Sequence, residues 1–582
     1  MYERRYDLLS SKFNEFFLPT LMTSMAGNIC LFVDSIIVSF LIGAVNLSAI
    51  QVASPLITFV NLIYWMIGLG GSVLCSIAKS EFDEEKSNSL FSVSIISLIA
   101  LGIIVLILGL LTKGTLIPML TTSPQIIPLV DSFFTVLLFG MPFLCYMMSL
   151  SYFVRADGLP NLAFRSILLS NIVNLVMDFV YIKVFGLGIG GAALATATGY
   201  AIGSLYVSTY FLKSERTLKF YKLSKIRFLN ALNYFKDIAI SGFSSASTQL
   251  FFTIQLIIYN AVIGVVLGKY GLTAYSVCRN CSFIIYIFLI GASQTMSPIV
   301  SVYYQEEDYS GVNYVVRKSL KIALIASITL ILIFTLLPQT VLTLYNVHDP
   351  TVIPIVVNAL RIYMISFVGV AITFLFTFYT QAIKRNKLSL STSILEGFIA
   401  PIGLLFALTP LIGSDGIWIS FVGAEVITII FIFIVSRYIS KKTHGEYGGF
   451  FINKRVPNGE VLDLTVDCDL KEAVNAAYDV EKYLKDLNVA DDKAMIVSLS
   501  IEEMLVNIIN TNKDLDSIDV LVKIQEKRIL LGIKDQGVEF NPVIENERLE
   551  FDNISVLNKI AEKIDYSRVL GLNSTVITIN NE

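Results

Sequence analysis

The stretch from Leu41 to Leu74, LIGAVNLSAIQVASPLITFVNLIYWMIGLGGSVL, has a counterpart later in the chain. Residues 266–299 read VLGKYGLTAYSVCRNCSFIIYIFLIGASQTMSPI, and both stretches continue into an acidic loop, SEFDEEKSN in the first copy and YYQEEDYSG in the second. Further along, GLPNLAFRSILLSN corresponds to KRNKLSLSTSILEG. A repeat of this length predicts two structurally related halves.

The composition places most of the chain in a membrane. Of the 582 residues 55% are hydrophobic and only 15% are charged, and the mean hydropathy is +0.70. A soluble protein has about 25% charged residues. The net charge of −3 is uninformative as a total, because basic and acidic residues are segregated by region, but no basic stripe suggests a nucleic-acid partner.

Apolar segments long enough to cross a bilayer, about 20 residues each, predict twelve membrane spans in an α-helical polytopic protein. Each half contains six of them, an even number, so the two six-helix lobes are expected to be parallel, with substrate bound between them. The predicted spans lie near residues 16–40, 50–77, 89–111, 126–153, 162–183, 191–212, 238–267, 272–302, 315–337, 353–380, 388–410 and 416–437.

Basic residues gather in alternate loops, among them RKSLK, KRNK and SRYISKKTH, whereas the opposite loops IGAVN and LIGSDG have none. The positive-inside rule therefore predicts that both ends of the chain are cytoplasmic, in a plasma membrane of the bacterial type. The predicted divisions are an N-lobe (1–212), a basic loop between the lobes (213–237), a C-lobe (238–442), a linker (443–460) and a cytoplasmic domain (461–582).

The tail has the pattern of a small soluble α/β domain. VLDLTVDC, SIDVLVKIQ and RILLGIKDQG alternate as strands do, and DLKEAVNAAYDVEKYLKDL and DDKAMIVSLSIEEMLVNIIN have helical spacing.

Polar residues interrupt the membrane segment NIVNLVMDFVYI (171–182), where Asn174 and Asp178 lie four apart on one helical face. A carboxylate at bilayer depth is costly and usually functional. The internal repeat places no acid opposite these residues in the second half. In this comparison Asp34 pairs with Tyr259, Asn174 with Ala400, Asp178 with Leu404 and Thr196 with Val422.

Two arrangements of this first-lobe cluster are open. Two carboxylates close together in a low dielectric share a proton, because both cannot stay ionised; alternatively a cation lies between them, with amide and hydroxyl oxygens completing its shell. Either gives a switchable site for H⁺ or Na⁺. The competing interpretation is that these groups only hydrogen-bond to one another across packed helices.

The runs VDSIIVSFLIGAVNLSAI and RADGLPNLAFRSILLSNIVNLVMDFVYIKVFGLGIGGAALATATG resemble the multidrug and toxic compound extrusion (MATE) family over about the first 440 residues. The resemblance implies antiport, in which H⁺ or Na⁺ enters and a bulky, often cationic organic compound leaves. By that motif Asp34, Asn174 and Asp178 line the cation site of the N-lobe, with Thr196 as a weaker match.

Other polar residues lie in the predicted spans. Glu396 and Glu425 are candidates for substrate binding or gating, and Gln249, Gln255 and Gln294 are candidates for lining a cavity; the alternative for each is local pairing between helices. The GLGG run at 68–71 lacks the lysine of a phosphate-binding loop, so we expect it to permit close helix packing.

Within the tail, SIEEMLVNIIN followed by IKDQGVEFNP resembles the Bergerat-fold ATPases, particularly the anti-sigma-factor serine kinases. That resemblance implies that Glu503 and Asn507 serve a nucleotide and Mg²⁺, that Asn507 is the metal ligand, and that Asp535 and Gly537 bind the adenine end of ATP. The glycine lid of those kinases is replaced by Phe551 and Asn553. The tail is therefore expected to be a degenerate module that regulates transport or binds a cytoplasmic regulatory protein, and no catalytic residue is assigned.

Two other functions remain open from the sequence. One is a flippase for lipid-linked oligosaccharides, which would need a cationic cavity for phosphates. The other is a membrane-bound sensor in which the tail acts as an anti-sigma kinase.

Overall fold

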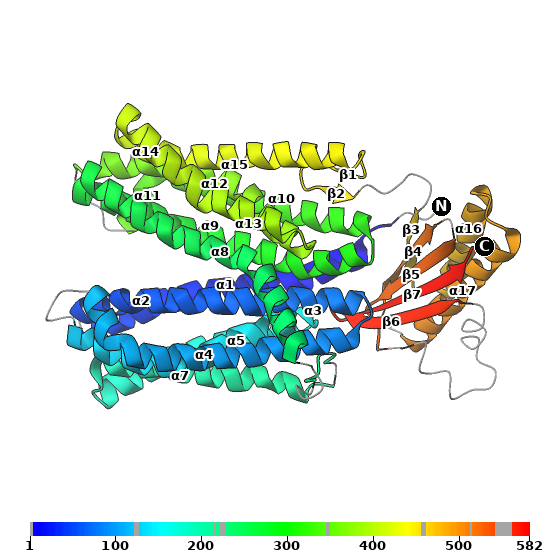
Figure 1. Cartoon of the computed structure of the whole chain (residues 1–582), viewed down its shortest axis with the longest axis horizontal. Coiled ribbons are helices and arrows are strands. Elements are labelled where there is room, and N and C mark those ends of the chain that lie inside the picture. Colours follow the sequence, from blue (N-terminus) through cyan, green and yellow to red (C-terminus); the bar gives the residue numbers. More distant parts are fainter. Residues whose placement is uncertain are drawn as a thin grey trace.

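In a computed structural model of the chain, long helices run side by side in two groups, with a small sheet domain at one end (Figure 1). The structure describes residues 4–42, 44–120, 127–214, 216–221, 228–344, 350–454, 461–512, 515–525, 527–539, 541 and 561–581. We call the end of the bundle beside the sheet domain the domain side and the other end the open side.

The first group of helices forms one lobe. Its elements are α1 (Asp7–Ile42), α2 (Ala44–Tyr64), the π-helix η1 (Trp65–Leu69), α3 (Gly70–Ser80), α4 (Glu84–Leu120), α5 (Ile127–Ala156), α6 (Pro160–Asp178), the π-helix η2 (Phe179–Val184), α7 (Gly188–Val207) and the 3₁₀ turn η3 (Ser208–Leu212).

The second group forms the other lobe. Its elements are α8 (Phe228–Val266), α9 (Gly268–Gln305), α10 (Tyr309–Leu336), α11 (Pro338–Leu344), α12 (Ile353–Ala382), α13 (Asn386–Ile394), the π-helix η5 (Leu395–Ile399), α14 (Ala400–Ile412) and α15 (Ser414–Lys442).

Eleven helical segments of the described chain are long and apolar enough to cross a membrane, and ten of them match predicted spans. The eleventh is α17 (Asp491–Thr511) of the tail, whose buried apolar residues pack against the sheet and form part of the core of the sheet domain. The spans predicted near 16–40 and 191–212 fall on α1 and α7, which are not among the eleven; both pack against α6. The helical multi-pass architecture is confirmed.

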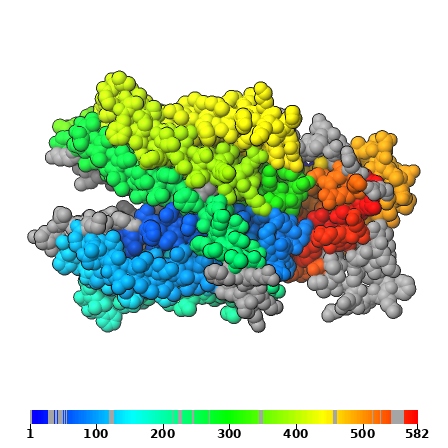
Figure 2. Space-filling model, in the orientation of Figure 1, coloured from blue at the N-terminus to red at the C-terminus, as the bar shows by residue number. Residues whose placement is uncertain are grey.

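The two lobes separate toward the open side. Figure 2 shows a cleft between them that opens at the end away from the sheet domain and narrows toward the domain side. Such a cleft between parallel lobes is where the repeat places a substrate path.

Glycines bring the lobes together on the domain side. A Cβ atom on Gly70 would lie 2.6 Å from the backbone nitrogen of Gly242 on α8 of the other lobe. Within the first lobe, one on Gly68 would lie 3.0 Å from Cα of Ser149 on α5. Only glycine allows backbones to approach this closely. The prediction that the GLGG run permits close helix packing is confirmed.

The described residues of the sheet domain form five antiparallel strands in the order β3-β4-β5-β7-β6. Its helices pack on one face, and the strands and helices expected from the alternation are all observed. The bounds are β3 (Val461–Asp467), α16 (Leu470–Asp486), α17, β4 (Ser517–Ile524), β5 (Arg528–Asp535), β6 (Lys563–Val569) and β7 (Leu572–Asn580); a hairpin of β1 (Tyr447–Gly448) and β2 (Asn453–Lys454) precedes them.

We predict that Gly70→Ala destabilises the bundle, because the added methyl group would press on the backbone of α8. Overpacking of this kind costs about 1–3 kcal/mol. The measurement is the midpoint of thermal unfolding in detergent. Gly403→Ala on α14 is the matched control, since nothing lies within 4 Å of its added Cβ; equal effects of the two substitutions would show that the contact is unimportant.

Candidate functional site

The first-lobe cluster is built on two helices that cross closely. On α6, Asn174 donates from Nδ2 to the hydroxyl of Thr196 on α7 over 3.3 Å. Gly199 permits this approach, because a Cβ there would lie 2.6 Å from the carbonyl oxygen of Ser170. Asp178, one turn after Asn174, is completely buried. The structure thus brings together Asn174 and Thr196 and places the buried Asp178 on the same helix as Asn174.

The backbone changes at the acid. The α-helix α6 ends at Asp178, and the π-helix η2 begins at the next residue. In the second lobe the π-helix η5 includes Glu396. π-Turns within helices occur frequently at functional sites, because they re-aim side chains and loosen the backbone hydrogen bonds. This feature marks the helical segments that carry Asp178 and Glu396 and is not visible in the sequence pattern.

The side chain of Asp34 lies outside the described residues, although the helix that carries it, α1, packs against α6. Its counterpart in the repeat, Tyr259 on α8, is fully buried. The hydroxyl of Tyr259 lies 2.6 Å from Oγ of Ser420 on α15 and donates to the carbonyl of Pro401 on α14 over 3.0 Å. In the second lobe the side chain at this position therefore contacts α14 and α15, which are the helices that correspond to α6 and α7.

The second lobe has an acidic pair of its own. Glu396 and Glu425 line one cavity of about 50 Å³, and Thr373 on α12 donates to Oε2 of Glu425 over 3.0 Å. These acids lie about one helical turn from the positions compared in the repeat, which is why the comparison assigned polar residues to the first lobe alone. The rest of the lining is aromatic and small: Thr248, Phe252, Gln255, Tyr286, Tyr363, Ser366, Phe367, Val370, Gly397, Phe421 and Ala424.

The three candidate glutamines have different surroundings. Gln255 lines the second-lobe cavity. Gln294 on α9 instead accepts from Nη1 of Arg155 on α5 over 3.0 Å, so it joins the two lobes. Gln249 is partly buried on α8 and is not among the residues that line this cavity.

Charged loops close the domain side of the bundle. Lys384 of the second lobe pairs with Glu81 of the first over 2.7 Å. Asp157 pairs with Lys79 and accepts from the hydroxyl of Tyr210 over 2.5 Å. The Lys384–Glu81 pair joins the two lobes at the end opposite the cleft, and the contacts of Asp157 stabilise the first lobe there.

The sheet domain docks on the same end through buried charges. Arg4 donates to both carboxylate oxygens of Asp308, 2.8 Å away, and lies 3.1 Å from Asp463 on β3 and from Asp519 on β4. Burial alone would lower the pKa of Arg4, but the three carboxylates raise it well above its usual range. We call Arg4, Asp308, Asp463 and Asp519 the docking cluster.

Further pairs extend this interface along the acidic loop of the second repeat. Lys534 on β5 pairs with Glu306, Lys523 on β4 pairs with Glu307, and Ser574 donates to Glu306 over 2.8 Å. The acidic loop, for which the sequence comparison suggested no partner, thus contacts two lysines on the docking face of the sheet.

The first lobe also contacts the sheet domain. A Cβ on Gly158, in the turn between α5 and α6, would lie 2.6 Å from the backbone nitrogen of Gly571 in the turn between β6 and β7. Gln536 donates to Glu15 on α1 over 3.3 Å. The domain therefore touches both lobes at their joined ends.

The residues proposed for nucleotide binding make internal hydrogen bonds. Asn507 donates from Nδ2 to the backbone oxygen of Glu503, one turn earlier on α17. Asp535, whose pKa burial raises, accepts from the amide nitrogen of Gly537 and from Nδ2 of Asn573. The lid positions 551 and 553 lie outside the described residues, and within those described no group of three or more His, Cys, Asp or Glu side chains could hold a metal ion.

Two parallel helical lobes around a cleft, each with buried acids, define a multi-pass membrane transporter. The sequence profile of the MatE family matches residues 19–180 and 245–409, and the chain belongs to that family. The profile ends before the tail, so the resemblance of residues 461–580 to ATPases stays a prediction.

Individual relatives agree with this assignment. The chain is 23% identical over 415 residues to the multidrug export protein MepA of Staphylococcus saprophyticus, covering 71% of this chain and 90% of that protein. It is 24% identical over 411 residues to MepA of Staphylococcus aureus, covering 70% and 89%.

Solved structures show the same fold. A MOP superfamily transporter from Pyrococcus furiosus superposes with a TM-score of 0.68 at 20% identity, over 74% of this chain and 96% of that one. An outward-facing MATE family multidrug resistance transporter gives 0.68 at 19% identity, with the same coverage.

We predict that docking of the sheet domain strengthens about ten-fold between pH 7 and pH 5. Burial and the neighbouring Asp308 raise the pKa of Asp463 to about 6, against the lowering effect of Arg4. A carboxyl group whose pKa is raised in the docked state takes up a proton on docking. The free energy of docking therefore becomes more favourable as the pH falls through 6. The docking equilibrium is measured by the hydrogen exchange of the backbone amides of residues 306–311, corrected for the intrinsic exchange rate at each pH.

Asp463→Asn should remove this pH dependence. Asp467→Asn, at an exposed carboxylate on the same strand, is the control and should keep it. If both variants keep it, another group titrates.

Proposed function

We propose that the protein is a cation-coupled antiporter that exports bulky cationic organic compounds by alternating access. The coupling ion is H⁺ or Na⁺, and its site lies in the first lobe at Asp34, Asn174, Asp178 and Thr196. The observation that carries the proposal is the complete burial of the Asp178 carboxylate beside the Asn174–Thr196 pair. A buried acid changes its affinity for a proton or cation whenever its surroundings open.

The pseudo-symmetry of the lobes supports the inclusion of Asp34 in this site. Its counterpart Tyr259 reaches the helices equivalent to α6 and α7 through hydrogen bonds. We infer that Asp34 supplies, together with Asp178, the pair of carboxylates that a shared proton or a bound cation requires.

The orientation follows from the basic loops. The domain side holds Lys384, Lys79 and the other charged loop residues, so the positive-inside rule assigns it to the cytoplasm. The cleft shown in Figure 2 then opens to the outside. We infer an outward-open state in a plasma membrane of the bacterial type, with the sheet domain in the cytoplasm.

The second-lobe cavity has the lining of a cation site, and its volume of about 50 Å³ means that it must widen during the transport cycle to admit a drug-sized compound, which needs about 300–1,000 Å³. Two carboxylates, Glu396 and Glu425, lie among aromatic rings that include Phe252, Tyr286 and Phe421. Carboxylates and ring faces both attract cations, the rings most strongly where water is excluded. Among the residues described as lining this cavity none is Lys or Arg, which favours a cationic substrate over the phosphates of a lipid-linked oligosaccharide.

The sheet domain is proposed to regulate transport by docking. Alternating access requires the joined ends of the lobes to separate. The domain contacts the first lobe at Gly158 and the second at Asp308, so it resists that separation while docked. ATP and Mg²⁺ binding is the weaker proposal, since Asp535 already accepts hydrogen bonds from within the domain.

We predict that Asp178→Asn lowers export at least ten-fold in proteoliposomes, because an amide cannot exchange a proton or neutralise a cation. The measurement is efflux of a fluorescent organic cation under an imposed pH or Na⁺ gradient. Asp131→Asn, an exposed carboxylate paired with Lys113, is the matched control and should export as the parent does. Unchanged export by Asp178→Asn would mean that the carboxylate only holds helices together.

We predict that Arg4→Gln releases the sheet domain and raises the export rate several-fold. The substitution leaves the buried carboxylates of Asp308, Asp463 and Asp519 without their cation, which costs about 3–5 kcal/mol. Arg5→Gln is the control, because Arg5 is half exposed and pairs with the exposed Asp467. Slower export by Arg4→Gln would show that docking activates transport.

A further inference from the structure

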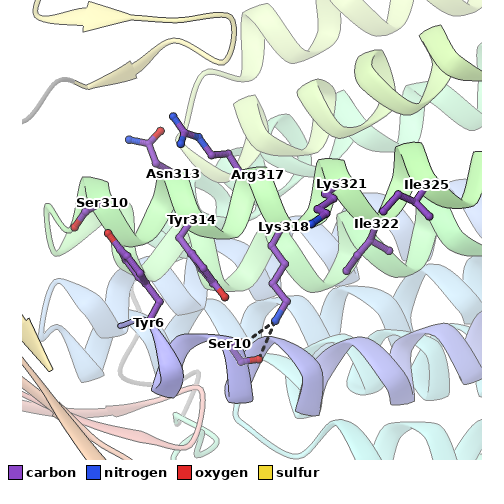
Figure 3. A pocket seen from close by; sticks show the side chains of 10 residues that line it. All are labelled: Tyr6, Ser10, Ser310, Asn313, Tyr314, Arg317, Lys318, Lys321, Ile322 and Ile325. Carbon is purple, nitrogen blue, oxygen red and sulfur yellow. Dashed lines mark hydrogen bonds between the residues drawn. The ribbon is translucent and has the colours of Figure 1, made fainter. Parts of the chain in front are cut away.

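A basic pocket lies on the domain side where the N-terminal segment meets α10. Its volume is about 740 Å³, within the range of small-molecule sites. Figure 3 shows Lys318 reaching toward Ser10 on α1, while Arg317 extends from another side of α10 beside Asn313. The lining residues are Tyr6, Ser10, Ser310, Asn313, Tyr314, Arg317, Lys318, Lys321, Ile322 and Ile325.

The pocket has three positive charges and no acid among its lining residues. Arg317 and Lys321 are exposed and four apart, so they share one face of α10. Lys318 donates to the hydroxyl of Ser10 over 2.8 Å and to the Ser10 carbonyl over 3.2 Å, which fixes its ammonium group at the wall. This arrangement attracts an anion and leaves two of the three cations available to it.

The pocket changes character along α10. Ser310 and Asn313 lie at the start of the helix, the three cations follow within about one turn, and Ile322 and Ile325 come next. Ile325 is 55% exposed, and the apolar surface continues with Ile328 and Leu332 at 45% and 50%. A polar end, a cationic belt and an apolar end match a phospholipid, whereas a free phosphate or a nucleotide would leave the apolar end uncovered.

The depth of the cations also fits a lipid headgroup. Arg317, Lys318 and Lys321 lie at the beginning of the span predicted near 315–337, where a membrane helix passes from the headgroups into the hydrocarbon. Basic pockets between membrane helices on the cytoplasmic side bind anionic headgroups. We propose that this pocket binds the headgroup of one anionic phospholipid, with an acyl chain along Ile322 and Ile325.

The pocket shares a wall with the docking interface. Tyr6 stacks on Tyr314 with ring centres 4.7 Å apart, and Arg4 of the docking cluster lies 5.0 Å from the Tyr6 ring. Ser310 lines the pocket and also bonds to Asp463 of the sheet domain. A lipid bound here would brace the N-terminal segment that carries Arg4.

The test is native mass spectrometry of the full chain after detergent removes bound lipid. Phosphatidylglycerol is titrated against phosphatidylcholine with the same chains, and inorganic phosphate is added as a competitor. The test variant is Arg317→Gln with Lys321→Gln, two exposed positions. The control is Arg437→Gln with Lys441→Gln, which removes the same charges at the same spacing from the domain-side end of α15.

Each basic side chain at an anionic surface changes binding about five-fold. We expect the test variant to bind phosphatidylglycerol about 20-fold more weakly, the control to bind as the parent does, and phosphatidylcholine to bind weakly to all three. Thermal unfolding without lipid should be the same for both double variants, which separates lost binding from lost folding.

Three results would overturn the proposal. The test variant could bind phosphatidylglycerol as tightly as the parent. Both double variants could weaken binding equally, which would indicate a general charge effect. Inorganic phosphate could displace the lipid at matched concentration, which would indicate a site for free anions.

Discussion

The close crossing of the lobes at Gly70 and Gly242 is the constraint on which the other features depend. In a bilayer no hydrophobic force drives apolar helices together, so they associate through close backbone packing and polar contacts. Here both are on one side of the bundle, where Lys384 pairs with Glu81 across the lobes. The open side lacks such a glycine contact among the described residues, and the cleft lies there (Figure 2).

The two lobes differ in which polar side chains they bury and in the partners of those side chains. The first lobe places Asp178 beside an amide–hydroxyl pair, whereas the second fills the position equivalent to Asp34 with the phenol of Tyr259, which is satisfied by neutral partners. Its acids, Glu396 and Glu425, lie at a cavity instead. An asymmetric distribution of acids within a symmetric scaffold lets one lobe handle the coupling ion while the other receives an organic cation, as proposed.

The sheet domain is attached to the bundle through buried charged groups, whereas the two membrane lobes contact each other mainly through close backbone packing. Its helices cover one sheet face, and the other face presents Asp463, Asp519 and Lys534 to the joined ends of the lobes. Arg4, from the very start of the chain, completes this interface. Removing one partner leaves a buried charge uncompensated, and this costs more free energy than the intact network contributes relative to apolar residues of the same size. The network therefore determines how the domain docks more than it strengthens docking. A domain held in this way can respond to pH and to the lipid beside it.

The sequence by itself determined the membrane lobes, their repeat, the polar face of α6 and the strands and helices of the tail, because hydropathy and side-chain periodicity are local properties. The glycine run was also interpretable, since it lacked the residues of a phosphate loop. Only the tertiary structure decided that Glu396 and Glu425 share a cavity, that Gln294 binds Arg155, and that Arg4 meets carboxylates more than 300 residues away. Those contacts depend on which helices and strands become neighbours, and no local pattern encodes the distance between residues far apart in the chain.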